Sequence, residues 1–135
     1  MQFRLVPLLA LSLVLSSPAC ARISTGQLLS YCEQLEKNWQ FTGDGKVEIR
    51  GGGTDAFRCW SYIEAFYELS YLVLVEEDGT QTHPVKACPP KGVSLTQLIR
   101  MFLQYARSNP GELHWEASLA MLNLLHKNFP CSATE

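Results

Sequence analysis

The chain has 135 residues, which is enough for a single domain with one modest hydrophobic core. Its 11 Lys and Arg residues against 13 Asp and Glu residues give a formal net charge of -2. No basic cluster stands out, which argues against a nucleic-acid partner, because binding along a phosphate backbone requires one. The longest acidic run, Glu76–Asp78, is typical of a solvated turn.

The N-terminus has the three-part pattern of a secretory signal. Arg4 precedes an apolar run from Leu5 to Leu15, and small residues stand before a cleavage point after Ala21. The apolar run is too short to span a bilayer, which needs about 20 residues, and no other membrane segment is apparent. We therefore expect residues 1–21 to be a signal peptide and residues 22–135 to be exported to the periplasm, with no membrane partner after cleavage.

The first exported segment predicts a helix over Thr25–Asn38. A capping box precedes it, in which the side chains of Ser24 and Gln27 each satisfy a backbone N–H that the helix leaves free. Glycine-rich residues 40–54 then form a connector. Within this connector Lys46–Arg50 alternates like a short strand, but no partner strand is evident.

A second helix is expected to begin near Thr54 or Asp55, either of which can cap it. We expect it to extend to about Glu76, although Tyr71–Val75 is rich in β-branched residues and could end it as a strand. Residues 77–92, with their prolines and glycines, are expected to form a loop.

The third helix repeats the start signal of the first, with Ser94 and Gln97 as its capping box. Asn109 is expected to end it and to cap a fourth helix that has Pro110 at its first position. Apolar residues cover much of the surface of this fourth helix, which predicts a central place in the core or in an oligomer interface. Pro130 stops it.

Cysteine usage supports the exported compartment. Cys20 leaves with the signal peptide, and an even number of cysteines in a short exported chain predicts two disulfides. No CxxC pair occurs and no cysteine has a histidine at metal-ligand spacing, so we expect no metal site and no cofactor. The remaining cysteines are Cys32, Cys59, Cys88 and Cys131.

Sequence alone allows three pairings of these cysteines, and the helix order favours one of them. The first helix ends soon after Cys32 and the second begins just before Cys59. A short connection makes the third and fourth helices an antiparallel hairpin, which brings Cys88 beside Cys131. The expected fold is therefore all-α: a small four-helix domain stapled by Cys32–Cys59 and Cys88–Cys131.

The sequence shows no catalytic set. His114 and His126 lie on one predicted helix but are too far apart to ligate one zinc ion, because such ligands stand three or four residues apart. Every exported cysteine is expected in a bridge, which leaves no thiol nucleophile. Partner binding is the better interpretation, with Tyr67 and Tyr71 as exposed anchors beside the main apolar stripe and His83 in the following loop.

Several motifs in order along the chain resemble the Tai family of type VI secretion amidase immunity proteins, which includes those called Rap. The ordered set covers most of the exported chain and is clearest from Cys88 to Cys131. Its members are Cys59-Trp60-Ser61-Tyr62-Ile63, Cys88-Pro89-Pro90-Lys91-Gly92-Val93-Ser94, Gln97-Leu98, Tyr105, Asn109-Pro110, Leu113-His114, Ala117 and Phe129-Pro130-Cys131.

The resemblance implies a single helical immunity domain over residues 22–135. Such proteins are periplasmic and often form homodimers, and they bind a secreted peptidoglycan amidase effector so that its active site is blocked. They are not enzymes. The alternative is another periplasmic binding module, such as a helical chaperone or an envelope accessory protein. A hydrolase that uses His114 as a general base is a third hypothesis, which loss of activity in His114→Ala would favour.

We predict that the exported protein begins at Arg22, because Ala19 and Ala21 are the small residues that a signal peptidase requires. The intact mass of the protein recovered from the periplasmic fraction tests this. A diacylglycerol-modified Cys20, as in a lipoprotein, would contradict it.

Overall fold

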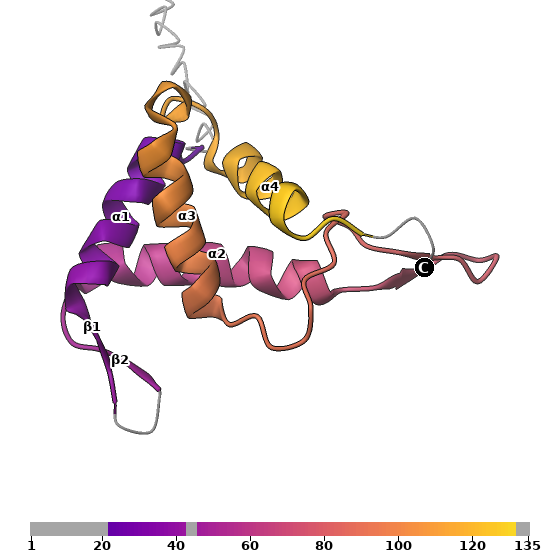
Figure 1. Ribbon diagram of the computed structural model, residues 1–135, viewed down its shortest axis with the longest axis horizontal. Helices are drawn as coiled ribbons and strands as arrows, with labels where there is room; N and C mark the ends of the chain where they lie inside the picture. Colours follow the sequence, from indigo (N-terminus) through magenta and orange to yellow (C-terminus); the bar gives the residue numbers. More distant parts are fainter. Residues whose placement is uncertain (1–21, 43–45, 132–135) are drawn as a thin grey trace, which may run out of the picture.

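The computed structural model describes residues 22–42 and 46–131, so the predicted signal peptide lies outside the described residues. The described part is mostly helical, as predicted (Figure 1), but the all-α class needs correction because two small antiparallel sheets are also present. The elements in chain order are α1 (Thr25–Asn38), β1 (Trp39–Phe41), β2 (Val47–Ile49), α2 (Gly53–Tyr71), β3 (Leu74–Val75), β4 (Gln81–Thr82), α3 (Leu95–Ser108), the 3-10 turn η1 (Pro110–Glu112) and α4 (Ala117–Asn128).

The helix α1 has the bounds that its capping box predicts. The Gln27 N–H donates to the Ser24 hydroxyl (3.2 Å), and the Ser24 N–H donates to the Gln27 side-chain oxygen (2.9 Å). Leu28, Cys32 and Leu35 follow at helical spacing and are fully buried on one face. Local hydrogen bonding therefore sets the start of α1, and packing sets its orientation.

The start of α2 differs from the prediction, since neither Thr54 nor Asp55 caps the helix. The cap is Gly52, which has a left-handed backbone with φ of 79° and makes no side-chain hydrogen bond. A Cβ at Gly52 would lie 2.6 Å from the Cβ of Ala56, so only glycine fits there without a shift of the chain. Asp55 instead pairs with Arg58 (3.3 Å).

The end of α2 also differs, because the helix stops at Tyr71 and not near Glu76. Leu72 is extended, and β3 follows and pairs antiparallel with β4, with Leu74 opposite Thr82. The β-branched run thus ends the helix as a strand, which was the alternative left open by the sequence. The predicted loop over 77–92 contains the returning strand β4.

The strand-like segment of the connector has a partner that the sequence analysis did not recognise. The strand β2 pairs with β1, so that Trp39 lies opposite Ile49. The strand β1 was not predicted because it follows α1 directly. Its aromatic rings are held by α3, where the Arg100 guanidinium lies 4.7 Å from the centroid of the Phe41 ring.

The fourth helix begins later than predicted. Asn109 and Pro110 introduce only the short turn η1, and α4 begins at Ala117. The segment between them, residues 113–116, is not part of a helix.

The reason lies at the start of α1, whose first N–H groups have no partner within the helix. The Thr25 N–H donates to the Trp115 carbonyl and the Gly26 N–H to the Leu113 carbonyl, both at 2.8 Å. In return the Ala117 N–H donates to the Ile23 carbonyl (3.0 Å). The Leu113 and Trp115 carbonyls are therefore bonded to α1. They cannot also accept the hydrogen bonds of a fourth helix that runs without a break from Pro110.

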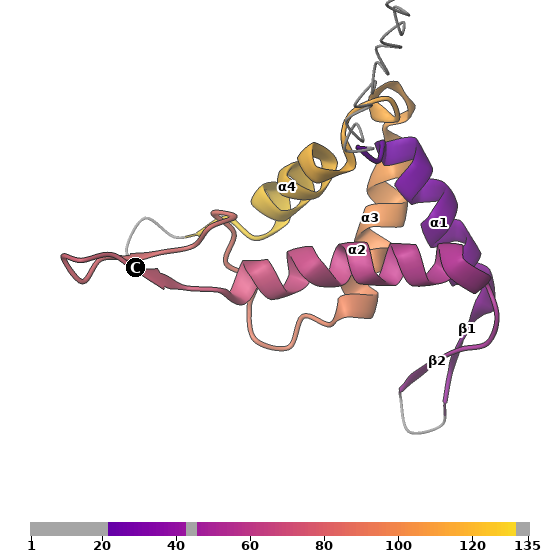
Figure 2. The ribbon, with the colours of Figure 1, turned by 180° about the vertical axis from the view of Figure 1, so that it is seen from behind.

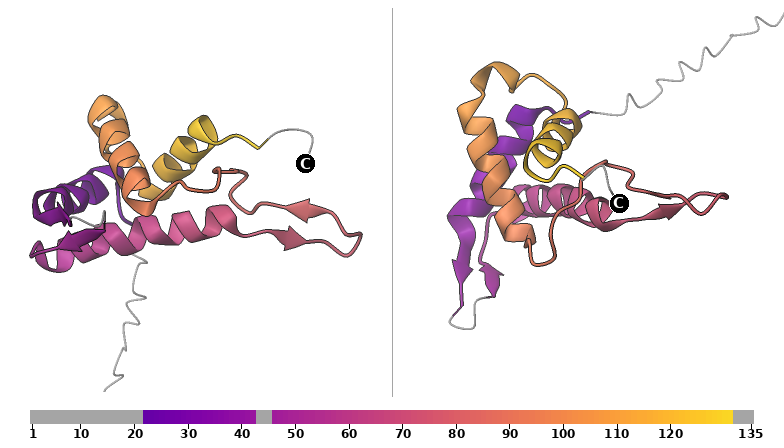
Figure 3. Two further views of the ribbon diagram at one scale, coloured as in Figure 1. Left: turned by 60° about the horizontal axis from the view of Figure 1, so that its bottom comes forward. Right: turned by 45° about the vertical axis from the view of Figure 1, so that its right-hand side comes forward.

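One hydrophobic core joins all four helices. Figures 1 and 2 show α1 and α3 side by side, with α2 crossing both, while the two hairpins project beyond opposite ends of α2; Figure 3 shows the same arrangement from two further directions. The largest fully buried apolar side chains are Phe102, Leu28, Leu35, Ile63, Leu98, Ile99, Leu103, Met121, Leu124 and Leu125.

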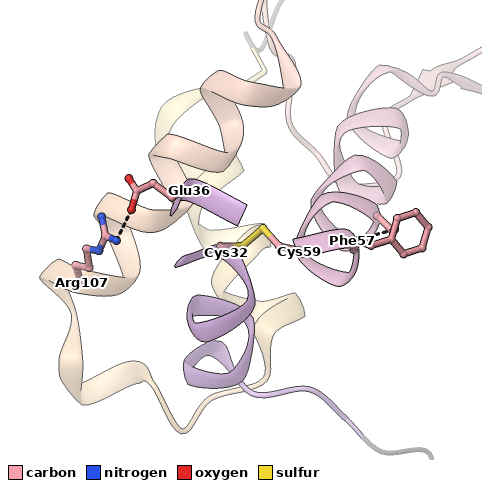
Figure 4. Close-up of a disulfide and its surroundings, with 6 residues drawn as sticks. Cys32, Glu36, Phe57, Cys59 and Arg107 are labelled. Atoms are coloured by element: carbon pink, nitrogen blue, oxygen red, sulfur yellow. Dashed lines mark hydrogen bonds and ion pairs between the residues drawn. A yellow bond between two sulfur atoms is a disulfide. The ribbon is translucent and has the colours of Figure 1, made fainter. Parts of the chain in front are cut away.

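The two disulfides have the pairing that the helix order favours. Cys32–Cys59 joins α1 to α2 inside the core, where both cysteines are 0% exposed (Figure 4). Cys88–Cys131 joins the segment before α3 to the segment after α4, and the Cys88 N–H also donates to the Phe129 carbonyl (2.8 Å). The first bridge belongs to the core and the second lies at the surface, because Cys131 is exposed.

We predict that Cys88–Cys131 is reduced before Cys32–Cys59, because a reducing thiolate must reach a sulfur atom and only Cys88–Cys131 is accessible without unfolding. The test is stepwise reduction with dithiothreitol, alkylation and non-reducing peptide mapping. Earlier opening of Cys32–Cys59, or recovery of a Cys59–Cys131 peptide, would contradict the arrangement.

Candidate partner-binding surface

An exposed apolar segment extends from the end of α2 into β3. Each residue of Leu72–Val75, here called the apolar arm, is at least 40% exposed, and Val75 reaches 67%. Figures 1 and 3 show that the β3–β4 hairpin, which contains the second half of the arm, projects away from the helical body. Contiguous exposed apolar side chains in a soluble protein mark an interaction surface.

The tip of the hairpin is acidic and ordered by its own hydrogen bonds. The Glu76 N–H donates to the Thr80 carbonyl (2.8 Å), and the Gly79 N–H donates to the Glu76 carbonyl (2.9 Å). The Thr80 N–H donates to the Asp78 carboxylate (2.9 Å), which holds the pKa of that carboxyl below its ordinary value. The arm therefore leads into an acidic turn in which the Asp78 carboxylate stays ionised at neutral pH.

Tyr67 and Tyr71, predicted as exposed anchors, form one structural unit. Their rings meet edge to face at a centroid distance of 5.1 Å. The Tyr67 hydroxyl donates to the Val93 carbonyl (3.1 Å) and the Tyr71 hydroxyl to the Pro90 carbonyl (3.3 Å). Tyr67 is half-buried and Tyr71 is 37% exposed, so the pair supports the segment before α3 and only Tyr71 offers much surface.

The third predicted residue, His83, follows β4 directly and is half-buried. Its carbonyl accepts from the Lys86 N–H (2.9 Å), which closes a turn in which Lys86 has a left-handed backbone with φ of 48°. The structure thus places His83 at the start of the segment whose end contacts the tyrosine pair. The residues share one segment, but they do not form a single cluster.

The segment between β4 and α3 is clamped to the end of α4. A ring nitrogen of His126 lies 2.6 Å from the Val85 carbonyl, and Ala87 forms an antiparallel bridge with Pro130. The exposed disulfide Cys88–Cys131 follows directly. The base of the hairpin is therefore fixed by α4 on one side and by the tyrosines on the other.

Within residues 22–42 and 46–131, no group of three or more His, Cys, Asp and Glu side chains could hold a metal ion. His114, the alternative general base, is exposed beside Trp115, with ring centroids 6.4 Å apart. No helix in this part of the chain is long and apolar enough to cross a membrane.

A sequence model of the Rap1a immunity proteins matches residues 24–131, which include all four helices, both hairpins and both disulfides. The chain belongs to the Rap1a immunity protein family. Membership implies an immunity protein that binds a secreted type VI effector, and it agrees with the resemblance found in the motifs. No curated protein and no solved structure matches the chain.

The apolar arm of this Rap1a-family protein is not among the contact residues that the sequence predicts. The sequence favours Leu72–Val75 as the end of α2, where apolar side chains would point partly into the core, with a strand as the alternative. The available signal was the β-branched run directly followed by an acidic turn, a combination typical of a hairpin and not of a helix end.

We predict that Tyr67→Phe lowers the free energy of unfolding by about 0.5–1.5 kcal/mol, because the half-buried hydroxyl loses its bond to the Val93 carbonyl. Urea unfolding followed by circular dichroism measures the loss. Tyr71→Phe is the matched control and should lose less, since its hydroxyl is more exposed and its bond to Pro90 is longer. The opposite ranking would show that the two tyrosines do not support the segment as described.

Proposed function

We propose that this protein is a periplasmic immunity protein that binds a secreted peptidoglycan amidase and blocks its active site. Membership of the Rap1a family supports the role as an immunity protein that binds a secreted effector. The motif resemblance to amidase immunity proteins supports an amidase as the target. The predicted signal peptide supports the periplasm. In this role the protein acts by binding and needs no catalysis of its own.

The projecting hairpin is the observation that best fits a blocking role. A cleft is closed by an element that stands out from its scaffold, and the apolar arm with its acidic tip does so. Binding energy is retained when such an element is ordered beforehand, because less entropy is lost on association. The clamp to α4 and the tyrosine pair supply that order at the base of the hairpin.

The chemistry of the arm also defines the target surface that it fits. Val75 and its neighbours require an apolar recess, and the ionised tip requires basic groups at the rim of that recess. Tyr71 lies at the start of the arm and offers an aromatic contact. A homodimer, the second partner implied by the resemblance, is compatible with this role as long as the arm stays uncovered.

We predict that Val75→Asp weakens inhibition of the amidase by at least about tenfold, because a charge replaces an apolar side chain at the centre of the contact. The assay is cleavage of purified peptidoglycan by a candidate secreted amidase that the unaltered protein inhibits, over a range of inhibitor concentrations. Tyr71→Ala should also weaken inhibition while leaving the helical circular-dichroism signal unchanged.

The matched control is Leu119→Asp, which introduces the same charge at an apolar residue of similar exposure at the start of α4. It should inhibit like the unaltered protein. Full cleavage in the presence of excess folded and oxidised protein would contradict the immunity role. Protection of many unrelated clients, with no specific partner, would favour the chaperone or envelope accessory alternative.

A further inference from the structure

The two disulfides of this chain differ in their surroundings. Both cysteines of Cys32–Cys59 are 0% exposed, whereas Cys131 is exposed and Cys88 is partly exposed. A thiolate in solution can therefore reach Cys88–Cys131 in the folded protein, while Cys32–Cys59 becomes accessible only when the core opens. Exposed disulfides are the ones that take part in thiol–disulfide exchange, and buried ones are structural.

The charges around the exposed bridge also favour exchange. Lys86, Lys91 and Lys127 each lie within five residues of one of its cysteines, and all three are exposed. No Asp or Glu occurs within the same distance along the described chain. Basic side chains near a cysteine stabilise its thiolate, so they attract an attacking thiolate and ease the departure of the leaving sulfur.

The bridge lies at the base of the β3–β4 hairpin. Figures 1 and 2 show the chain after β4 running past the end of α4 before it turns toward α3. The Cys88 N–H donates to the Phe129 carbonyl (2.8 Å), and Ala87 forms an antiparallel bridge with Pro130. Both contacts involve residues that follow α4, and the bond to Cys131 keeps these residues against the base of the hairpin.

The base of the hairpin also contains an unfavourable backbone conformation. Lys86 has a φ of 48°, in the left-handed region that residues with a Cβ seldom adopt. Its neighbours Val85 and Ala87 are buried, and its N–H donates to the His83 carbonyl (2.9 Å). A strained residue persists only while the surrounding contacts hold it. Opening the covalent link two residues away removes one of those constraints.

We propose that Cys88–Cys131 is a site of thiol–disulfide exchange that controls the order of the apolar arm. The reacting partner is a dithiol reductant, the two-cysteine site of a thiol–disulfide oxidoreductase. Reduction frees the residues after α4, lets the backbone relax at Lys86, and so loosens the hairpin. The helical body stays folded, because the core and the buried Cys32–Cys59 bridge are untouched.

The exchange consists of two displacements. A thiolate of the reductant attacks the exposed Cys131 sulfur, the S–S bond breaks, and Cys88 leaves as a thiolate. The second thiolate of the reductant then attacks the reductant's own sulfur in the mixed disulfide, and Cys131 leaves as a thiolate. The chain gains two electrons and, once both thiolates are protonated, two protons. The reductant becomes a disulfide.

The consequence for effector binding rests on the proposed function. An arm that is ordered before association binds more tightly, because less entropy is lost. The oxidised protein is therefore the tight inhibitor, and the reduced protein is the weak one. The order of the arm can be measured without any amidase, so the two proposals can fail separately.

The experiment compares the oxidised protein with protein in which dithiothreitol has opened Cys88–Cys131 alone, as verified by alkylation and peptide mapping. Hydrogen exchange measured by NMR should become at least about tenfold faster at the Lys86 and Cys88 amides after opening. Amides inside α1 should change much less, because α1 stays joined to α2. Reoxidation with oxidised glutathione should restore slow exchange.

The double variant Cys88→Ser with Cys131→Ser reproduces the open state without a reductant, and it should show the same fast exchange at Lys86. Dithiothreitol under the same conditions should not change its exchange further, because the variant lacks the reactive bridge. Equal exchange in the oxidised and the opened protein would overturn the proposal. Acceleration in α1 as large as that at Lys86 would also overturn it, since the whole domain would then be loosened.

Inhibition is measured with the double variant, so that no reductant reaches the amidase. Half inhibition of a candidate secreted amidase that the unaltered protein inhibits should require at least about tenfold more of the variant. Unchanged inhibition despite faster exchange would overturn the control of effector binding by this bridge. If the bridge controls exchange but the oxidised protein inhibits no amidase, the proposed function fails and the exchange site stands.

Discussion

The architecture depends on the exchange of backbone hydrogen bonds between the start of α1 and the link before α4. The N–H groups of Thr25 and Gly26 would have no partner within their own helix, and the Trp115 and Leu113 carbonyls satisfy them. Ala117 completes the exchange at the first residue of α4. This contact joins the N-terminal end of the described chain to the start of α4. The buried Cys32–Cys59 bridge then ties α1 to α2, so α1 is the element through which the others are positioned.

The elements that the sequence predicted well are those whose ends are set by neighbouring residues. The capping box at Ser24 and the Ser94 cap, which accepts from the Gln97 N–H but lacks the reciprocal bond of the predicted box, place the starts of α1 and α3 correctly, because each involves residues three apart. The ends that were wrong depend on distant contacts. The start of α2 needs the left-handed Gly52, which also lies close to Gln34 and Asn38 of α1, and the start of α4 is delayed by the bonds to α1. Neither contact can be predicted from the residues next to the start of the helix.

The candidate surface was predicted in part, for a similar reason. The spacing of Tyr67 and Tyr71 correctly placed them together on one side of α2, but it could not show that their hydroxyls bind the segment before α3. His83 lies in the segment expected of it, and its half-buried state follows from the turn around Lys86. The apolar arm was not predicted because the end of a helix would bury part of the same side chains, whereas the hairpin exposes them. The acidic turn directly after this run is the sequence feature that distinguishes the two.

The separation of the apolar arm from the core has an evolutionary consequence. Substitutions at exposed positions such as Val75 change the free energy of unfolding by only a few tenths of a kcal/mol, roughly within ±0.5 kcal/mol. Mutations in the hairpin are therefore nearly neutral for folding, while they alter the shape and charge of the surface proposed here to bind the effector. If the hairpin binds the effector as proposed, a lineage that meets a new effector can remodel this tip stepwise and keep the disulfide-stapled body unchanged.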